Sequence, residues 1–365
     1  MGTKAKSLIL AIVAIMTLAG CPNETACEPV RNPVLPVTEY SPVNEALKSR
    51  ILAYLTLLET DAAGKILVGQ NVGHADWSGS YHYSEYSQAE YALTGKLAAM
   101  LGIDLGWDDF ASDYSQMLLD IETHWTAGGL VTISAHMPNP KTLGDVRDKN
   151  FSHDDYRAIL TEGSKTRERW LTYLSNIANI FQVLKEKHVI VLWRPLHEMN
   201  GGWFWWGNDI FPPSSEQFTA LWRDMYAYFL ITRRLDNLLW VYGPNYRYSL
   251  QMPQTDFYYP GSDYVNIVGL DYYNDGMDEL DANTGYERLE VLGKPMGICE
   301  IGPAGLFDGT FDNTLYEGIT ANYPRVSYML VWHSWPGYKV AIHDNLKPSQ
   351  LMNSPQIITL DEVDY

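Results

Sequence analysis

Cysteine and basic residues are both scarce in this chain. Three cysteines, Cys21, Cys27 and Cys299, occur in 365 residues, too few for the disulfide framework that stabilises small secreted domains. None of them stands in the Cys/His spacing of a zinc site. Lysine and arginine number 26 against 44 aspartate and glutamate residues, a formal net charge of −18. Nucleic acid and anionic lipid surfaces are therefore excluded as expected partners, whereas a neutral polymer meets no electrostatic penalty.

The sequence also lacks an apolar run long enough to cross a bilayer, which takes about 20 residues. The apolar stretch at 7–20 is shorter, follows Lys4 and Lys6, and ends in Leu18-Ala19-Gly20 before Cys21. This pattern is typical of an export signal, and it resembles the bacterial lipoprotein signal in which the cysteine is lipidated after cleavage. We expect residues 1–20 to be a signal peptide and the exported protein to be anchored to a membrane through Cys21. Ordinary secretion, with no lipid on the cysteine, is the alternative.

Internal repeats and interrupting linkers are absent after residue 42. Residues 21–42 are rich in proline, asparagine, glutamate and threonine without a helical or strand period, which predicts a tether. Residues 43–365 exceed one typical domain in length, yet α/β barrels reach this size as single domains. We therefore expect one catalytic domain over 43–365, acting as a monomer.

Short apolar runs rich in β-branched residues alternate with longer segments of helical period. Residues 189–193, Val-Ile-Val-Leu-Trp, are apolar throughout, as in a strand buried on both faces. Eight such alternations predict the α/β class, with a parallel sheet closed into a (β/α)8 TIM barrel. The predicted strands are 65–69, 101–105, 130–135, 189–193, 238–242, 265–270, 295–299 and 328–332. The predicted helices are 84–100, 112–127, 165–187, 215–235 and 278–292.

Two glutamates follow predicted strands, in the region where barrels of this kind carry their catalytic groups. Glu198 follows the fourth strand and Glu300 the seventh, so the two side chains can face each other across the barrel mouth. A retaining glycosidase needs two carboxyls about 5–5.5 Å apart, one to protonate the leaving oxygen and one to attack the anomeric carbon. A solvated or ion-paired role would explain either glutamate alone, but their joint position indicates a retaining glycosidase.

Aromatic residues are abundant in segments that carry turn signals. The chain has 12 tryptophans and 25 tyrosines. Flat aromatic rings can cover the C–H faces of sugars, although core packing is the simpler explanation for any single ring. As a set they favour a polysaccharide partner: Trp77, Tyr81, Tyr83, Trp203, Trp205, Trp206, Tyr258 and Tyr259.

Two segments carry a resemblance to a known family. Residues 193–207, Trp-Arg-Pro-Leu-His-Glu-Met-Asn-Gly-Gly-Trp-Phe-Trp-Trp-Gly, closely resemble the acid/base signature of glycoside hydrolase family 26, whose commonest members are β-1,4-mannanases. Residues 297–302, Gly-Ile-Cys-Glu-Ile-Gly, resemble its nucleophile segment, a shorter and less specific match. The resemblance implies that Glu198 is the general acid/base and Glu300 the nucleophile. The aromatic run at 203–206 could keep the acid protonated, and Arg194 or Tyr273 could keep the nucleophile ionised.

The resemblance also implies a set of substrate contacts. His136 and His197 resemble sugar-contacting histidines, Trp203 lines the leaving-group side, and Trp332 resembles the platform under the −1 sugar. Tyr273 resembles the tyrosine that hydrogen-bonds the nucleophile. Tyr272 is the alternative, although strand alternation places Asp271 and Tyr273 on one face.

One position departs from the family pattern. His333 stands where many members have an arginine that helps to hold the −2 sugar. The resemblance therefore does not tell which side chain holds the −2 sugar in this chain. Side chains of the first loop could compensate, because loops after barrel strands carry specificity. The candidates are Asn71, His74, Asp76 and Trp77.

The function that follows is endo-acting hydrolysis of β-1,4-mannosidic linkages in mannan, glucomannan or galactomannan by double displacement. The partners would be β-mannan and manno-oligosaccharides. An exo-acting mannobiohydrolase and, from another class, a non-catalytic carbohydrate-binding protein are the alternatives. We expect no metal and no cofactor, since His136, His197 and His333 are explained as sugar contacts. Cys299, one residue before Glu300, is expected to point away from the barrel lumen and to serve in packing.

Overall fold

The structure, a computed structural model, describes residues 40–60, 64–74, 82–106, 113–276 and 285–365. The predicted signal peptide, most of the predicted tether, Cys21 and Cys27 lie outside these ranges, as do Asp76, Trp77 and Tyr81. Within the described residues, no helix combines the length and the apolar character needed to cross a bilayer.

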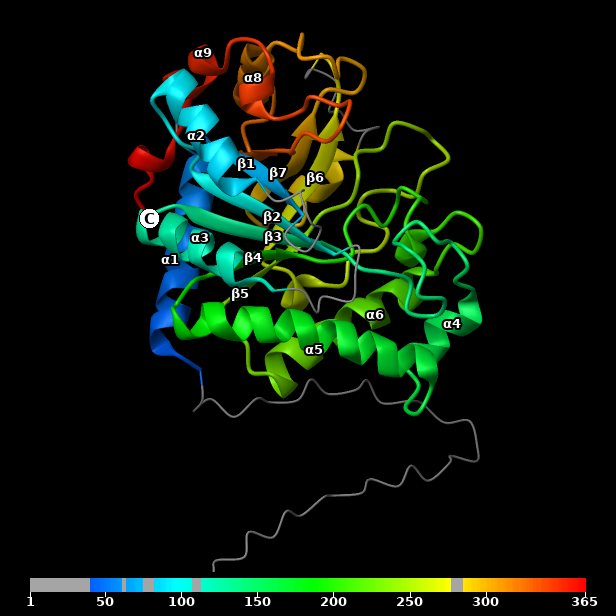
Figure 1. The fold of residues 1–365 in the computed structure, drawn as a ribbon. Helices are drawn as coiled ribbons and strands as arrows, with labels where there is room; N and C mark the ends of the chain where they lie inside the picture. Colours follow the sequence, from blue (N-terminus) through cyan, green and yellow to red (C-terminus); the bar gives the residue numbers. More distant parts are fainter. Residues whose placement is uncertain (1–39, 61–63, 75–81, 107–112, 277–284) are drawn as a thin grey trace, which may run out of the picture. The chain divides into compact units, whose positions relative to one another are not determined.

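Eight parallel strands close into a barrel, with helices between them (Figure 1). Each strand pairs with the next along the chain, and β8 pairs with β1 to complete the ring. The predicted (β/α)8 fold is thus confirmed, with strand ends displaced by a few residues. The barrel strands are β1 (Ile66–His74), β2 (Met100–Gly106), β3 (Leu130–His136), β4 (Val191–Arg194), β5 (Leu238–Tyr242), β6 (Ile267–Tyr273), β7 (Met296–Gly302) and β8 (Val326–Val331), and the short β9 (Ile357–Ile358) pairs with β1 outside the ring.

The helices follow the predicted alternation but differ from it at their ends. They are α1 (Pro42–Thr60), α2 (Tyr83–Thr94), α3 (Ser115–Thr126), α4 (His153–Ala158), α5 (Lys165–Glu186), α6 (Ser215–Ala227), α7 (Tyr286–Glu290), α8 (Glu317–Asn322) and α9 (Pro348–Met352). The helix predicted over 84–100 is wrong from Gly95 onward. Gly95 takes a left-handed conformation, with φ of 72°, and its N–H bonds the carbonyl of Tyr91, which ends α2 and releases the chain into β2.

Two further helices also differ from the prediction. The helix expected over 215–235 ends as an α-helix at Ala227 and continues as one π-turn, Tyr228–Thr232. Of the helix expected over 278–292, only α7 is seen, and residues 278–284 lie outside the described part of the chain.

Helix α1, which the sequence did not predict, closes one end of the barrel. Its buried Ile51 and Leu55 belong to an inner apolar cluster with Leu67, Leu130 and Ile267, which lie at or near the starts of their strands. Burying these side chains removes apolar surface from water at the amino-terminal end of the strands. The opposite, carboxyl-terminal end is therefore where polar side chains can gather.

Alternation along each strand divides the core into two layers. In β3, Val131 and Ile133 pack outward against the helices, whereas Ser134 and His136 face the lumen with the other polar strand ends. The strand interiors thus build the outer core, and every second residue near a strand's end is available to a site.

A bulge in β7 overturns the expected direction of Cys299. The pairing of β6 with β7 moves from Leu270–Ile298 to Asp271–Glu300, which leaves Cys299 as an extra residue. Cys299 lies in the inner cluster, with its Sγ 3.3 Å from the hydroxyl oxygen of Tyr328. Both Cys299 and Glu300 therefore face inward. Burial raises the pKa of the Cys299 thiol to about 12, so the residue packs as a neutral thiol.

Candidate active site

A buried charge network joins the ends of β4, β6 and β7. One guanidinium nitrogen of Arg194 donates to Asp271 Oδ2 at 2.7 Å, and another donates to Glu300 Oε1. Arg194 is 1% exposed, and both carboxylates are also buried. A guanidinium can satisfy two carboxylates because its donors form a rigid fork. Arg194 therefore holds Glu300, as the sequence suggested, and also braces the barrel interior.

Tyr273 secures the second oxygen of Glu300. Its hydroxyl donates to Glu300 Oε2 at 2.9 Å. Burial and the facing Glu300 and Glu198 raise the pKa of the Tyr273 hydroxyl well above its usual range, which keeps it a donor. Tyr272 points to the outer core, where its ring lies 5.1 Å from that of Tyr246. Both oxygens of Glu300 are thus fixed by donors, Arg194 from β4 across the barrel and Tyr273 from the neighbouring β6.

Glu198 lies on the loop after β4 in a left-handed backbone conformation. Its φ is 53°, and that of Leu196 is 48°. The Glu198 N–H bonds the carbonyl of Gly243 at 2.8 Å, and Trp203 Nε1 donates to Glu198 Oε2 at 2.6 Å. Trp206 Nε1 donates to the carbonyl of His197 at 2.8 Å, which ties the aromatic run to the same loop. The loop thus aims a partly exposed carboxyl over the buried one.

The two glutamates meet at the barrel mouth. One oxygen each of Glu198, Asp271 and Glu300 lie within 4.8 Å of one another. Burial and the nearby charge of Glu300 raise the pKa of Glu198 to about 8, although the bond from Trp203 and the charge of Arg194 oppose the rise. Glu198 therefore retains a proton in neutral solution, while Glu300 faces the guanidinium.

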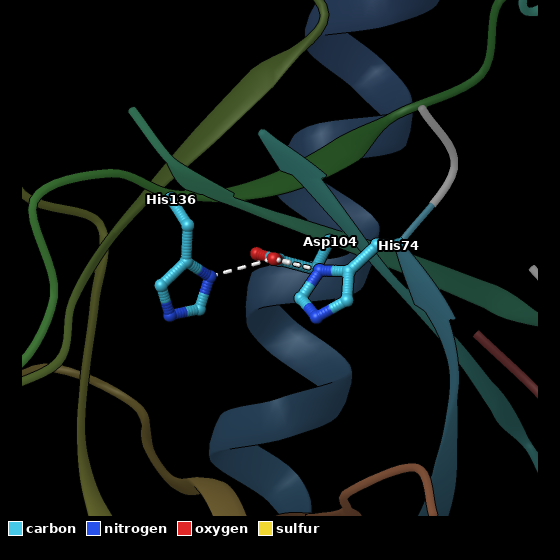
Figure 2. A group of neighbouring side chains, drawn as sticks. All are labelled: His74, Asp104 and His136. Atoms are coloured by element: carbon cyan, nitrogen blue, oxygen red, sulfur yellow. Dashed lines mark hydrogen bonds and ion pairs between the residues drawn. The ribbon is translucent and has the colours of Figure 1, made fainter. Parts of the chain in front are cut away.

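A histidine pair shares one carboxylate oxygen beside the glutamates (Figure 2). Asp104, at the end of β2, places its Oδ2 2.6 Å from Nδ1 of both His74 and His136. Ser134 donates to the other oxygen at 2.6 Å. Burial acts to raise the pKa of Asp104, but the two histidines hold it well below its usual range. Because the ionised carboxylate can only accept, each Nδ1 carries a proton.

His136 links this pair to His197. The Nε2 atoms of His136 and His197 are 3.2 Å apart, and His197 Nε2 is 3.9 Å from Glu300 Oε1. Burial and the charge of Arg194 lower the pKa of His197 well below its usual range, so the ring is neutral. Contacts therefore run from Asp104 through two imidazoles to the edge of Glu300.

His333 occupies the far side of the histidine pair. Its Nδ1 lies 2.9 Å from Asn71 Oδ1, and its ring centroid lies 4.8 Å from that of His74. Burial lowers the pKa of His333 to about 3. A neutral imidazole thus stands where the family pattern suggested a permanent positive charge.

The sequence-predicted site residues are brought together around the two glutamates. Trp332 follows β8, and its ring lies 6.4 Å from that of His136 and 5.0 Å from that of His333. Trp203 lies against Glu198 on the β4 side. Sequence reasoning assigned no role to Asp104 and treated His74 only as a loop residue. The available signal was their position at the ends of strands, with Asp104 and His136 facing one lumen.

Two clusters of the described residues offer three potential metal ligands each, namely His74 with Asp104 and His136, and Glu198 with Asp271 and Glu300. The first set has the two imidazoles and one carboxylate that zinc accepts. Its Nδ1–Oδ2 separations of 2.6 Å are those of charge-assisted hydrogen bonds. The second set already holds Arg194 as its counter-charge.

A closed (β/α)8 barrel with opposed carboxyls after its fourth and seventh strands defines the class of barrel glycoside hydrolases. Within that class the chain belongs to glycosyl hydrolase family 26, whose family model matches residues 42–362. The resemblance of residues 193–207 and 297–302 to this family is therefore confirmed.

Individual relatives agree with this assignment. A mannan endo-1,4-beta-mannosidase of Bacillus subtilis is 31% identical over 348 residues, covering 88% of this chain and 92% of that protein. Mannan endo-1,4-beta-mannosidase A and B of Caldalkalibacillus mannanilyticus is 34% identical over 336 residues, covering 88% of this chain but 62% of that protein. The structure of a Bacillus subtilis mannanase is similar with a TM-score of 0.75 at 28% identity, covering 88% of this chain and 95% of that one.

Proposed function

We propose that this family 26 glycosyl hydrolase is an endo-acting β-mannanase that cleaves β-1,4-mannosidic bonds in mannan, glucomannan or galactomannan with retention. The observation that carries the proposal is the approach of Glu198 and Glu300 oxygens to within 4.8 Å. Retaining enzymes hold their carboxyls about 5–5.5 Å apart, whereas inverting enzymes leave about 6.5–9.5 Å for a water molecule. The choice of mannan as substrate is supported by the mannan endo-1,4-beta-mannosidases among the relatives and by the aromatic run after Glu198.

In the first step Glu300 attacks the anomeric carbon of the −1 sugar. The bond from that carbon to the glycosidic oxygen breaks, and the proton of Glu198 moves to the departing oxygen. Arg194 and Tyr273 hold the two oxygens of Glu300, so the attacking lone pair is already oriented. In the second step Glu198 takes a proton from water, whose oxygen displaces Glu300 and restores both groups.

The surrounding side chains fit the binding of a sugar chain across the mouth. Trp332 offers a ring next to His136 at the end of β8, where we place the pyranose in the −1 position, and Trp203 borders the leaving-group side through its bond to Glu198. His136 and His197 supply ring nitrogens for sugar hydroxyls near the reacting carbon. A non-catalytic binding protein would have no use for the raised pKa of one glutamate and the fixed geometry of the other.

A time course of products from mannohexaose tests the proposal and its mode. An endo-acting enzyme yields several product lengths from the start, whereas an exo-acting mannobiohydrolase yields predominantly mannobiose. Proton NMR of the first-formed anomer tests retention directly, because the new reducing end must appear first in the β configuration. Binding of mannohexaose without any turnover would instead support the carbohydrate-binding alternative.

We also propose that the protein is exported and held at a membrane by a lipid on Cys21. The support is the order of basic residues, apolar stretch and small residues before that cysteine. The same tether would let a monomeric barrel reach a polymer outside the membrane.

The pH dependence should report the proton on Glu198. Because this group must be protonated for the first step and its pKa is raised to about 8, kcat/KM should fall as pH rises through that region. Trp203→Phe removes a donor to the ionised carboxylate, so the alkaline limb should move upward by about half a unit to one unit. Profiles of kcat/KM against pH measure this, with Trp125→Phe on helix α3 as the control. A limb that moves downward in Trp203→Phe would contradict the assigned hydrogen bond.

Asp104 should matter for turnover although it does not contact Glu300. Asp104→Ala removes the acceptor that orients His136 and, through it, His197, so kcat should fall about 10- to 100-fold with a smaller change in KM. Ser134→Ala, which removes only the bond to the other Asp104 oxygen, should stay within about threefold of wild type.

A double-mutant cycle separates this role from general destabilisation. If Asp104 acts through His136, the Asp104→Ala/His136→Ala variant should be no slower than His136→Ala alone. If the rate losses of the two single variants multiply in the double variant, the two residues act independently. Melting curves would show whether each variant is folded.

A further inference from the structure

Three aromatic side chains form an exposed cluster on the loops after β7 and β8. Trp335 is 38% and Tyr338 is 44% exposed, and Phe307 is half-buried beside them. The Trp335 and Tyr338 rings are stacked, with centroids 5.0 Å apart and planes 20° apart. The Phe307 ring lies 5.2 Å from that of Tyr338. We call Phe307, Trp335 and Tyr338 the aromatic turn.

Hydrogen bonds hold the aromatic turn in one shape. The N–H groups of Trp335 and Tyr338 each donate to the other's carbonyl, at 3.0 and 2.8 Å. Gly337 between them has a φ of 86°, which a glycine adopts without strain. The N–H of Lys339 donates to the carbonyl of Phe307 at 2.9 Å and ties the two loops together. A preformed surface loses little conformational entropy when a ligand binds.

The base of the turn is fixed as well. The hydroxyl oxygen of Ser334 accepts from the N–H groups of Val340 and Ala341 at 2.9 and 3.0 Å, so the segment between them is closed like a loop on a stem. The Ser334 N–H in turn donates to the hydroxyl of Tyr86 at 2.8 Å. The rings are therefore presented by backbone that is anchored to helix α2.

The aromatic turn continues a line of rings that begins at the active site. Trp332 lies at the end of β8, the His333 ring is 5.0 Å from it, and the Trp335 ring is 6.1 Å from His333. In the closed strand order β8 stands opposite β4, whose loop carries Glu198 and Trp203. A sugar chain that leaves Trp203, passes the two glutamates and covers Trp332 therefore heads toward the aromatic turn.

We propose that the aromatic turn is a further sugar-binding subsite, which takes a pyranose ring of the same β-1,4-linked chain on the glycone side, beyond the sugar that covers Trp332. The proposal rests on the proposed function, because Glu198 protonates the leaving group and so places the aglycone on the β4 side. Flat, exposed rings cover the C–H face of a sugar, and the Tyr338 hydroxyl can bond its hydroxyl groups. Continuity with Trp332 through His333 favours a sugar over a protein partner.

The test compares Trp335→Ala and Tyr338→Ala on manno-oligosaccharides of graded length. For the longest substrates kcat/KM should fall about 5- to 10-fold, whereas the shortest hydrolysed substrate, which cannot reach the turn, should be unaffected. The mixture of products from mannohexaose should also change, because the sugar chain would no longer be held at the aromatic turn on the glycone side of the cleaved bond. Tyr91→Ala is the matched control, because this tyrosine is 62% exposed on α2 and should change neither result.

Two results would overturn the subsite. One is an equal loss on all substrate lengths, which would mean that the variants disturb the catalytic centre. The other is unchanged kinetics with a change in sedimentation from dimer to monomer, which would assign the turn to a second copy of the chain. Failure of the proposed function is separate, since wild-type protein would then not hydrolyse mannan. In that case calorimetry of mannohexaose binding, with and without Trp335→Ala, still decides whether the turn binds sugar.

Discussion

Replacing Glu300 by alanine should lower kcat on mannan by at least about 10⁴-fold, because the group that forms the bond to the anomeric carbon is lost. Arg194 and Tyr273 would remain but would have no nucleophile to orient. KM should change much less, since the aromatic contacts to sugar are intact. Initial rates of reducing-sugar release measure the loss, and a thermal melt confirms that the variant is folded.

Azide supplies the matched control for Glu300→Ala. A small anion can occupy the space of the missing carboxylate and attack from the same face, which would give an α-mannosyl azide and restore part of the rate on an activated substrate. In a variant of Glu198, azide would instead attack the glycosyl-enzyme from the opposite face and give the β product. If Glu300→Ala kept more than about a hundredth of the wild-type rate, Glu300 would not be the nucleophile.

The second large effect is expected from Glu198→Gln, which removes the proton donor but keeps the shape of the side chain. On mannan, kcat should fall about 10²- to 10⁴-fold, the range of general acid catalysis. A dinitrophenyl mannoside, whose leaving group needs no proton, should still form the glycosyl-enzyme at a rate near that of wild type. Burst kinetics with this substrate would separate the two steps.

The pH profile gives an independent check of Glu198→Gln. The alkaline limb of kcat/KM that wild type shows on mannan should be absent from the residual activity of Glu198→Gln on mannan, because the group whose pKa is raised to about 8 no longer titrates. A limb that persisted unchanged would assign it to another residue, and the acid would then have to be sought elsewhere in the mouth.

The barrel and the two glutamates were predictable from the sequence because both depend on local patterns. Buried parallel strands need continuous apolar runs such as residues 189–193, and Glu198 and Glu300 stand near the carboxyl-terminal ends of two of those runs. Closure of the ring then follows from the number of alternations. No knowledge of side-chain contacts is required for either inference.

Features that depend on irregular backbone or on distant contacts were not predictable. A strand drawn with strict alternation points Cys299 and Glu300 to opposite faces, and only the bulge opposite Leu270 and Asp271 turns both inward. His74 reaches Asp104 because the pairing of β1 with β2 also shifts between Asn71 and His74. Neither register shift can be detected in the amino-acid composition or in the hydrophobic periodicity of the sequence.

Helix α1 was missed for a different reason. It precedes the first strand and so stands outside the alternation by which the other helices were found. The end of α2 had a local signal in Gly95, but the apolar residues after it continue the helical pattern until they enter β2.

The left-handed backbone at Leu196 and Glu198 bears on the stability of the molecule. A side chain other than glycine in this conformation costs about 1–2 kcal/mol, and the two residues lie within three positions of each other. Glycine at position 198 would relieve that cost but would remove the carboxyl that the loop directs at the sugar, whereas glycine at position 196 would also remove a fully buried leucine side chain from the core. This stretch therefore gives up folding free energy for a fixed proton donor, so the most stable version of this barrel and the most active one are different sequences.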